Sequence, residues 1–175
     1  MSNRFPAFGL VLFALISAQL ACGGGSAATQ IAPLPPAATQ PPAKGERGTP
    51  DEAQALLKVA IDHYNQVGAE QAHADFNAGT APWVDRDLYV VCLRKDHTES
   101  VNAGFPQYVG VNPDTLFTTG AGVPLGQAIL DAAAAGGAGY ADYSWVNPVS
   151  NQTEPKRLFV QAVGDEVCGV GAYNP

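Results

Sequence analysis

The sequence is poor in charged side chains, and above all in cations. Only 14% of its 175 residues are charged, and 9 Lys and Arg stand against 16 Asp and Glu, which gives a formal net charge of −7. The whole acidic excess lies from Asp51 onward, where 15 acids stand against 6 bases. Because a surface of this sign repels phosphate backbones, the composition argues against nucleic acid as a partner.

Motifs for catalysis and metal binding are also missing. The histidines, His63, His73 and His97, lack the spacing of metal ligands. The glycine-rich stretches "GAGVPLG" (120–126) and "GGAGY" (136–140) do not follow a strand in the pattern of a phosphate loop. We therefore predict that the chain is not an enzyme and uses no metal and no cofactor.

The N-terminus, by contrast, has a recognisable pattern. Arg4 precedes the apolar stretch "FPAFGLVLFALISAQLA" (5–21), which is typical of a secretory signal and short for a membrane span. The stretch ends at "QLAC", which resembles the lipobox of bacterial lipoproteins, with Cys22 as the lipidated residue. Gln19 stands where that pattern usually has leucine, and Leu20 comes one place late. An ordinary cleaved signal and an uncleaved anchor are the alternatives.

Residues 23–49 are rich in Gly, Ala, Pro, Thr and Gln and have few large apolar groups, so we interpret them as a flexible tether. The three segments predicted are thus a signal peptide (1–22), a tether (23–49) and a folded domain (50–175). On this interpretation the domain is exported and held by lipid to a bacterial membrane, on its periplasmic or cell-surface side.

The three cysteines leave two interpretations open. If Cys22 carries lipid, Cys92 and Cys168 remain as a pair in an oxidising compartment, where a disulfide persists. Both lie in strand-like runs, "DLYVVCLR" and "EVCGVGAY". Two separate buried thiols that behave as small apolar side chains would give the same sequence.

The folded part begins with a helix. Thr49 suits the cap, Pro50 the first helical position and Glu52 the acidic position of a capping box. A helical apolar stripe follows, at Ala53, Leu56, Leu57, Ala60, Ile61, Tyr64 and Val67. Gly68 interrupts it, and "AEQAHADFN" (69–77) predicts a second helix.

Strand-like runs make up most of the remainder. "DLYVVCLRK" (87–95) and "HTESVNAG" (97–104) predict a hairpin, and "GVPLGQAILDAAAAGG" (122–137) predicts a helix. "GYADYSWVN", "PKRLFVQAV" and "EVCGVGAY" predict three further strands. A final run of strands joined by short turns implies an antiparallel sheet with helices packed on it, which is an α+β domain.

Two segments carry a resemblance to a known family. "FNAGTAPWVDRDLYVVCLRKD" (76–96) and "GYADYSWVNPVSNQTEPKRLFVQAVGDEVCGVGAYNP" (139–175) resemble a single Cache domain of the second type, an extracytoplasmic relative of the PAS fold. The resemblance covers about residues 51–173. It implies a long N-terminal helix packed along a roughly five-stranded antiparallel sheet.

The resemblance also implies a function. Such domains usually lie outside the membrane on chemoreceptors and sensor kinases. They bind small organic molecules, often short carboxylates, between the sheet and the layer that covers it. The chain is accordingly expected to be a ligand-binding sensor domain. It would act through a partner such as a sensor kinase or receptor, or serve as a binding protein.

A pocket for a carboxylate needs a fixed cation or several hydrogen-bond donors, and aromatic walls. Lys156 supplies the cation, and Tyr143 and Trp145 supply walls or donors. Lys156 and Tyr143 match the lysine and tyrosine that the family has in these strands. Trp83 and Tyr89 lie in the earlier segment and are expected to close the other side.

The chain departs from the family at two points. Asn102-Ala103 stands where the family often has a histidine-proline pair, although Asn102 retains the capacity to hydrogen-bond a ligand. Phe159 stands where a tyrosine is frequent, and it cannot form such a bond.

Other interpretations of these residues are open. Aromatic residues at alternating strand positions are common in cross-strand packing, and a lysine at a strand start is ordinarily solvated. Arg157 faces opposite to Lys156 in an ideal strand, so we expect it at the surface. The alternative function is a structural or interaction lipoprotein with a Cache-like fold that has lost its pocket, which the replacements at Asn102 and Phe159 would fit.

Overall fold

The computed structural model describes residues 47–134 and 136–175. The predicted signal peptide, the lipidation of Cys22 and nearly all of the predicted tether lie outside these residues. Among the helices of the described part, none has both the length and the hydrophobicity needed to cross a membrane.

The first helix, α1 (Pro50–Val67), begins as the sequence predicts. The Thr49 side chain accepts a hydrogen bond from the Glu52 N–H, and the Glu52 carboxylate accepts one from the Thr49 N–H, which completes the capping box. Gly68, at φ 82°, ends α1 and precedes α2 (Ala69–Asn77). This positive φ favours glycine, which explains the interruption of the apolar stripe.

The sheet is antiparallel and has six strands. These are β1 (Val84–Asp85), β2 (Leu88–Arg94), β3 (Glu99–Asn102), β4 (Ala138–Val146), β5 (Thr153–Val163) and β6 (Glu166–Tyr173). The strand order is β1-β2-β6-β5-β4, and β3 also pairs with β2. The prediction of a roughly five-stranded antiparallel sheet is confirmed, with the two-residue β1 as an addition.

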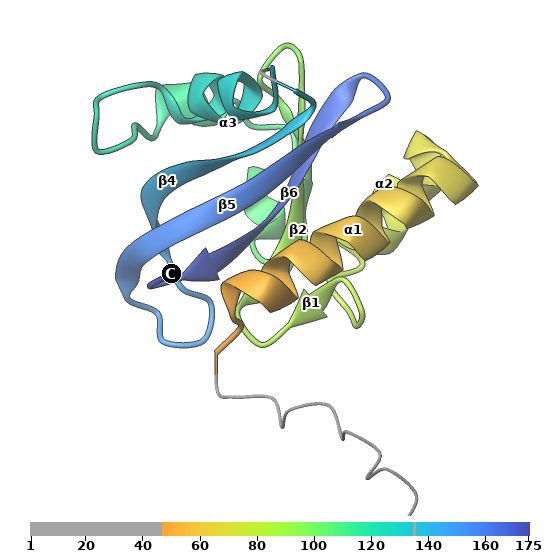
Figure 1. The fold of residues 1–175 in the computed structure, drawn as a ribbon, viewed down its shortest axis with the longest axis horizontal. Coiled ribbons are helices and arrows are strands. Elements are labelled where there is room, and N and C mark those ends of the chain that lie inside the picture. The colour runs from red at the N-terminus through yellow and green to blue at the C-terminus, as the bar shows by residue number, and fades with distance from the viewer. Residues whose placement is uncertain (1–46, 135) are drawn as a thin grey trace, which may run out of the picture. The chain divides into compact units, whose positions relative to one another are not determined.

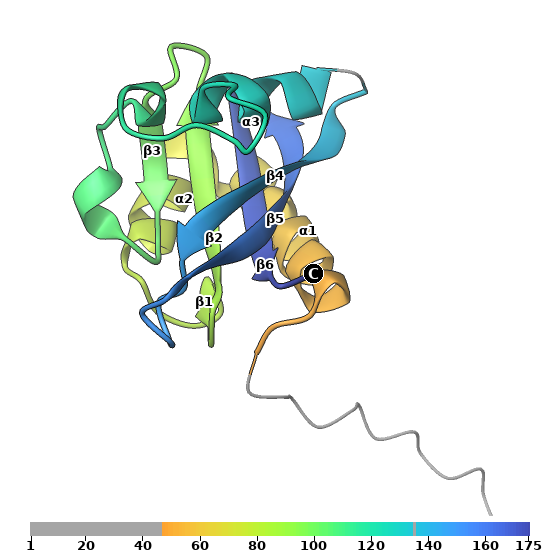
Figure 2. The same ribbon diagram turned by 90° about the vertical axis from the view of Figure 1, so that its left-hand side faces the viewer.

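The helices cover opposite faces of the sheet (Figures 1 and 2). α1 and α2 pack on one face, around a core that includes Phe76, Leu88, Val90 and Val170. α3 (Leu125–Ala134) packs on the other face together with the segment 103–124. That segment contains two short 3-10 helices, η1 (Pro106–Tyr108) and η2 (Pro113–Thr115). The α+β class and the long N-terminal helix packed along an antiparallel sheet are confirmed.

Residue parity assigns each strand side chain to a face. Along β5, Lys156, Leu158 and Val160 are buried, and the last two belong to the α3-side core. Phe159 packs against the α1-side core, and Arg157 lies half-buried at the surface, paired with Asp142. Lys156 and Arg157 thus face opposite ways, as the alternation predicts.

Cys92 and Cys168 are direct cross-strand partners on β2 and β6, and they are joined by a disulfide. Both belong to the α1-side core. The bond therefore links two central strands beneath α1, on the face opposite α3.

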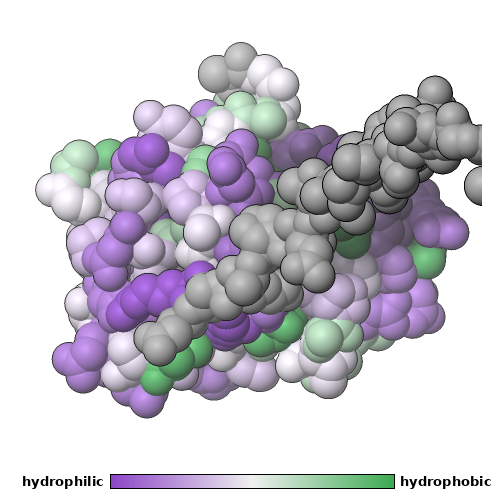
Figure 3. Space-filling model, turned by 60° about the horizontal axis from the view of Figure 1, so that its bottom comes forward, coloured by the Kyte–Doolittle hydropathy of each residue, from purple (hydrophilic) through white to green (hydrophobic). Residues whose placement is uncertain are grey.

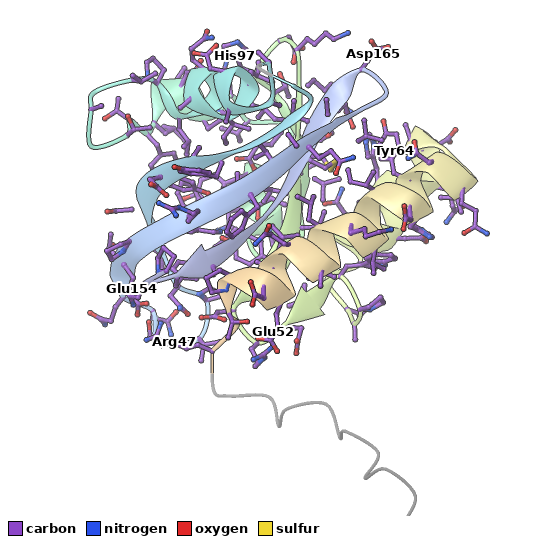
Figure 4. All side chains as sticks on the ribbon, in the orientation of Figure 1. Arg47, Glu52, Tyr64, His97, Glu154 and Asp165 are labelled. Carbon is purple, nitrogen blue, oxygen red and sulfur yellow. A yellow bond between two sulfur atoms is a disulfide. The ribbon has the colours of Figure 1, made fainter. Side chains whose placement is uncertain are left out.

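Hydrogen bonds and an ion pair join the residues just before α1 to the β4–β5 turn. Asp87, which is fully buried, accepts hydrogen bonds from the Gly48 N–H at 2.7 Å and from Asn147 Nδ2 at 3.0 Å. Arg47 forms a two-pronged ion pair with Glu154. Figure 4 shows Arg47 beside Glu154, with Glu52 on the first turn of α1.

The surface near this end of the sheet is mainly polar. In Figure 3 the coloured residues are largely hydrophilic, with hydrophobic side chains scattered singly or in small groups. Isolated apolar groups of this kind are ordinary on a protein surface and mark no binding face.

Candidate functional site

Lys156 is the buried cation on the α3 side of the sheet. Its side chain is 2% exposed and extends from β5 over the neighbouring strand β6 at Gly171. A Cβ at position 171 would lie 2.1 Å from Lys156 Cε, so only glycine leaves room for the side chain there. The second glycine of "GVGAY", Gly171, thus leaves the room through which the lysine side chain extends into the interior.

Three tyrosines surround the Lys156 ammonium. Nζ donates a hydrogen bond to the Tyr89 hydroxyl at 2.7 Å and lies 3.9 Å from the centroid of that ring. The ring centroids of Tyr173 and Tyr143 are 4.9 and 6.0 Å from Nζ. Within the described residues, no carboxylate pairs with Nζ. Burial lowers the pKa of Lys156 to about 7, although the charges of Glu99 and Asp87 oppose this change.

The hydroxyl groups continue this contact as a chain. The Tyr173 hydroxyl donates to the Val146 carbonyl at 2.8 Å, so its single proton is already used. In the 3.1 Å hydrogen bond between Tyr89 and Tyr173, the Tyr89 hydroxyl is therefore the donor. The chain runs from Lys156 through Tyr89 and Tyr173 to the backbone at the end of β4.

A small cavity lies beside this group, between the sheet and α3. Its polar lining comes from Tyr89, Glu99, Asn102 and Tyr143. Its apolar lining includes Trp145 on β4 and Leu125 and Ile129 on α3. The space open to the centre of a water-sized sphere is about 20 Å³, which is room for about one water molecule. In this conformation the site is closed.

Glu99 is a site residue that the sequence analysis missed. It comes from β3, is 7% exposed and lines the cavity. Its Oε2 accepts a hydrogen bond from Asn102 Nδ2 at 2.9 Å. Burial raises the pKa of Glu99 to about 7, against the lowering effects of Asn102 and Lys156. An acid in a short strand is usually solvated, so no pattern in the sequence marked it.

Aromatic side chains of the segment 103–124 close the outer side of the site. The Trp145 ring lies 6.1 Å from Phe105, 5.4 Å from Tyr108 and 4.4 Å from Phe117, measured between ring centroids. A surface groove lined by these rings runs along the same strand end. Trp145 thus separates the buried cavity from the groove.

The structure brings most of the predicted site residues together. Tyr89, Asn102, Tyr143 and Trp145 line one cavity. Lys156 Nζ lies within 6.0 Å of the ring centroids of Tyr89 and Tyr143, but Lys156 does not line this cavity and instead lines a surface pocket that Tyr143 also lines.

Two sequence-based interpretations are corrected. Trp83 does not close the site, because it packs with Phe76 and His63 under the helices on the opposite face, with ring centroids 4.7 Å apart in each pair. Phe159 also faces that side. Its lack of a hydroxyl therefore removes no polar group from the cavity.

Comparison with known proteins supports the fold assignment. No family model matches the sequence, and no curated protein matches it. Among solved structures, a methyl-accepting chemotaxis protein from Vibrio parahaemolyticus RIMD 2210633 is 20% identical, with a TM-score of 0.59 over 70% of this chain and 86% of that one.

Two further solved structures are similar. The periplasmic sensor domain of a chemotaxis protein is 24% identical, with a TM-score of 0.54 over 71% of this chain and 90% of that one. A Cache chemosensory domain that recognises carboxylic acids is 15% identical, with a TM-score of 0.52 over 71% of this chain and 88% of that one. The described residues therefore form a single domain with the fold of the Cache-type sensor domains.

Proposed function

We propose that this chain is an extracytoplasmic sensor domain that binds a small organic carboxylate in the site between the sheet and α3. The observation that carries the proposal is the Lys156 ammonium, which is buried among tyrosine rings beside a cavity. Burying an unpaired ion costs several kcal/mol, and an anionic guest would offset that cost.

The donors available to such a guest lie on neighbouring strands. The ammonium has three N–H groups, of which one is used by Tyr89. The Tyr143 hydroxyl forms no hydrogen bond with any described residue, and Tyr143 and Lys156 are direct cross-strand partners. Together they offer a carboxylate two donors from one side, while Trp145 offers an apolar wall.

Binding on this proposal requires the closed site to open. A cavity with room for about one water is too small for a carboxylate, so α3 or the aromatic segment 103–124 must move outward. Such movement in response to a ligand is what a sensor domain needs to change its state.

The location and output of the domain belong to the same proposal. The Cys92–Cys168 disulfide is consistent with an oxidising compartment. We infer export and anchoring through Cys22, with a receptor or sensor kinase as the partner that receives the signal, or a role as a binding protein. The periplasmic and chemosensory domains of similar fold support an extracytoplasmic position.

The closed cavity also favours a second candidate, a Cache-like interaction protein without a ligand. Binding experiments separate the two candidates. Short carboxylates and their uncharged amides, such as propionate and propionamide, are titrated into the full chain in a mild detergent. Binding is followed by calorimetry and by thermal unfolding. The sensor proposal expects carboxylates to bind and to raise the unfolding temperature, and the amides to fail.

Lys156→Met and Arg157→Met form a matched pair for this experiment. Loss of a charge-assisted hydrogen bond should weaken binding about ten- to a hundredfold in Lys156→Met. Arg157→Met, on the opposite face, should change affinity little. Equal losses in both variants would instead indicate general attraction to positive charge, and absence of binding by every carboxylate would support the interaction protein.

A further inference from the structure

Glu99 lines the cavity with an ionisable group whose charge is opposite in sign to that of the neighbouring Lys156. A carboxyl group that is 7% exposed and lines a cavity is unusual unless something pairs with it. Two sets of contacts fix the Glu99 backbone. Glu99 pairs with Leu93 in the β2–β3 hairpin, and its N–H and C=O form hydrogen bonds with Val111 and Gly110. The side chain is thus held at one point of the cavity wall.

Asn102 orients the Glu99 carboxyl group. The Asn102 Oδ1 atom accepts the Phe105 N–H at 2.9 Å, so its amide nitrogen must point the other way, toward Glu99 Oε2. Only Oε2 is engaged in this contact. Among the residues that the structure describes, none donates a hydrogen bond to Oε1.

Lys156 and Glu99 do not pair with each other. Both are buried, but no nitrogen–oxygen contact within 4.0 Å joins them in the described part of the chain. Tyr89 and Tyr143 approach the ammonium and also line the cavity that Glu99 lines. The molecule therefore holds a buried amino group and a buried carboxyl group near one small space without a direct contact between them.

A ligand that pairs with both Lys156 and Glu99 must itself carry a negative and a positive charge. On the basis of the proposed function, we propose that the ligand is a small zwitterion whose carboxylate binds Lys156 and Tyr143 and whose ammonium group binds Glu99. The charges of such a guest would replace the solvation that burial removes from both side chains. A simple carboxylate would leave Glu99 unpaired, and a site discriminates strongly against a ligand that leaves a buried polar group unsatisfied.

Matched pairs of ligands test this inference. Glycine, alanine and 2-aminobutyrate are each compared with acetate, propionate and butyrate, which have the same carbon skeleton without the ammonium group. Calorimetric titration of the full chain at pH 7 in a mild detergent gives the Kd values. We expect at least one amino acid to bind about tenfold or more tightly than its partner, since a hydrogen bond between charged groups is at stake.

Glu99→Gln tests whether the Glu99 carboxylate causes the preference for amino acids. The preference for the amino acid should disappear in this variant, while Glu70→Gln, which removes an exposed acid on α2, should retain it. If Glu99→Gln does not fold, Glu99→Asp takes its place. Its shorter side chain withdraws the carboxylate, so the preference should fall while the affinity for the simple carboxylate stays unchanged.

The outcomes distinguish this inference from the proposed function. Simple carboxylates that bind as tightly as the amino acids, or a preference that survives in the Glu99 variants, would overturn the zwitterion and leave the carboxylate sensor standing. Absence of binding by all six compounds would overturn both. A preference for amino acids that is lost only with Glu99 supports both.

Discussion

The pH dependence of stability should reveal the burial of the Lys156 amino group. Burial lowers the pKa of this group from an ordinary 10.5 to about 7. As the pH falls from 10.5 to 7, the unfolded chain binds this proton and the folded chain does not, so the group makes the folded state progressively less stable. At about 1.4 kcal/mol per unit of pKa, the loss is at most about 5 kcal/mol. Below pH 7 the loss is complete and constant.

Lys156→Met should remove this slope. The variant loses the hydrogen bond to Tyr89, but that loss is independent of pH and shifts the whole profile equally. The free energy of unfolding of the full chain is therefore measured by urea denaturation at several values between pH 7 and 10. Profiles that run parallel for the two proteins would refute the reasoning, because the lysine would then titrate normally in the folded state.

Glu99 should change the pH dependence of stability in the direction opposite to Lys156, at acidic pH. Burial raises its pKa from 4.5 to about 7, so between these values the folded chain holds a proton that the unfolded chain has lost. Stability contributed by this group is full below pH 4.5 and decreases as the pH rises to 7. Glu99→Gln should flatten this decrease, and a variant that retains it would show that another group is responsible.

Three further predictions concern other parts of the chain. Replacing Cys92 and Cys168 together by alanine should destabilise the domain by about 4 kcal/mol, because the disulfide closes a loop across a separation of 76 residues. An unchanged urea midpoint would contradict this. Gly171→Ala forces the Lys156 side chain to move and should cost about 1–3 kcal/mol, whereas Gly120→Ala enters open space and should cost little by the same measurement. Cys22→Ser should release the chain from membranes into the soluble fraction after cell fractionation. Unchanged membrane association would indicate an uncleaved anchor.

Sequence reasoning succeeded where the determining interactions are local. The cap at Thr49 depends on residues within one helical turn, and the opposite facing of Lys156 and Arg157 depends only on the strand period of two. For Phe159, three positions after Lys156, the same period already indicates the opposite face, where the structure places it. Sequence reasoning failed for Trp83, because this residue lies in the turn before β1, where no strand period indicates the face on which it packs. That choice is made by tertiary packing.

One feature of the site could be predicted from the sequence, and another could not. Glycine inside a strand often marks close approach of another group, and Gly171 is such a residue. The burial of Glu99, however, depends on α3 and the β2–β3 hairpin meeting over the same cavity. Nothing within a few residues of Glu99 predicts this.

The chain of hydroxyl groups has a direction, and this direction affects any guest. Since the Tyr89 proton is committed to Tyr173 and one lone pair accepts the Lys156 N–H, the Tyr89 oxygen keeps one lone pair and has no proton to donate. At Tyr89 the cavity wall can therefore accept a hydrogen bond from a guest but cannot donate one, while Tyr143 retains a proton to donate. A molecule that enters this site would meet an acceptor on β2 and a donor on β4, two strands that β6 and β5 separate in the sheet, and this difference in polarity would favour one orientation of the guest.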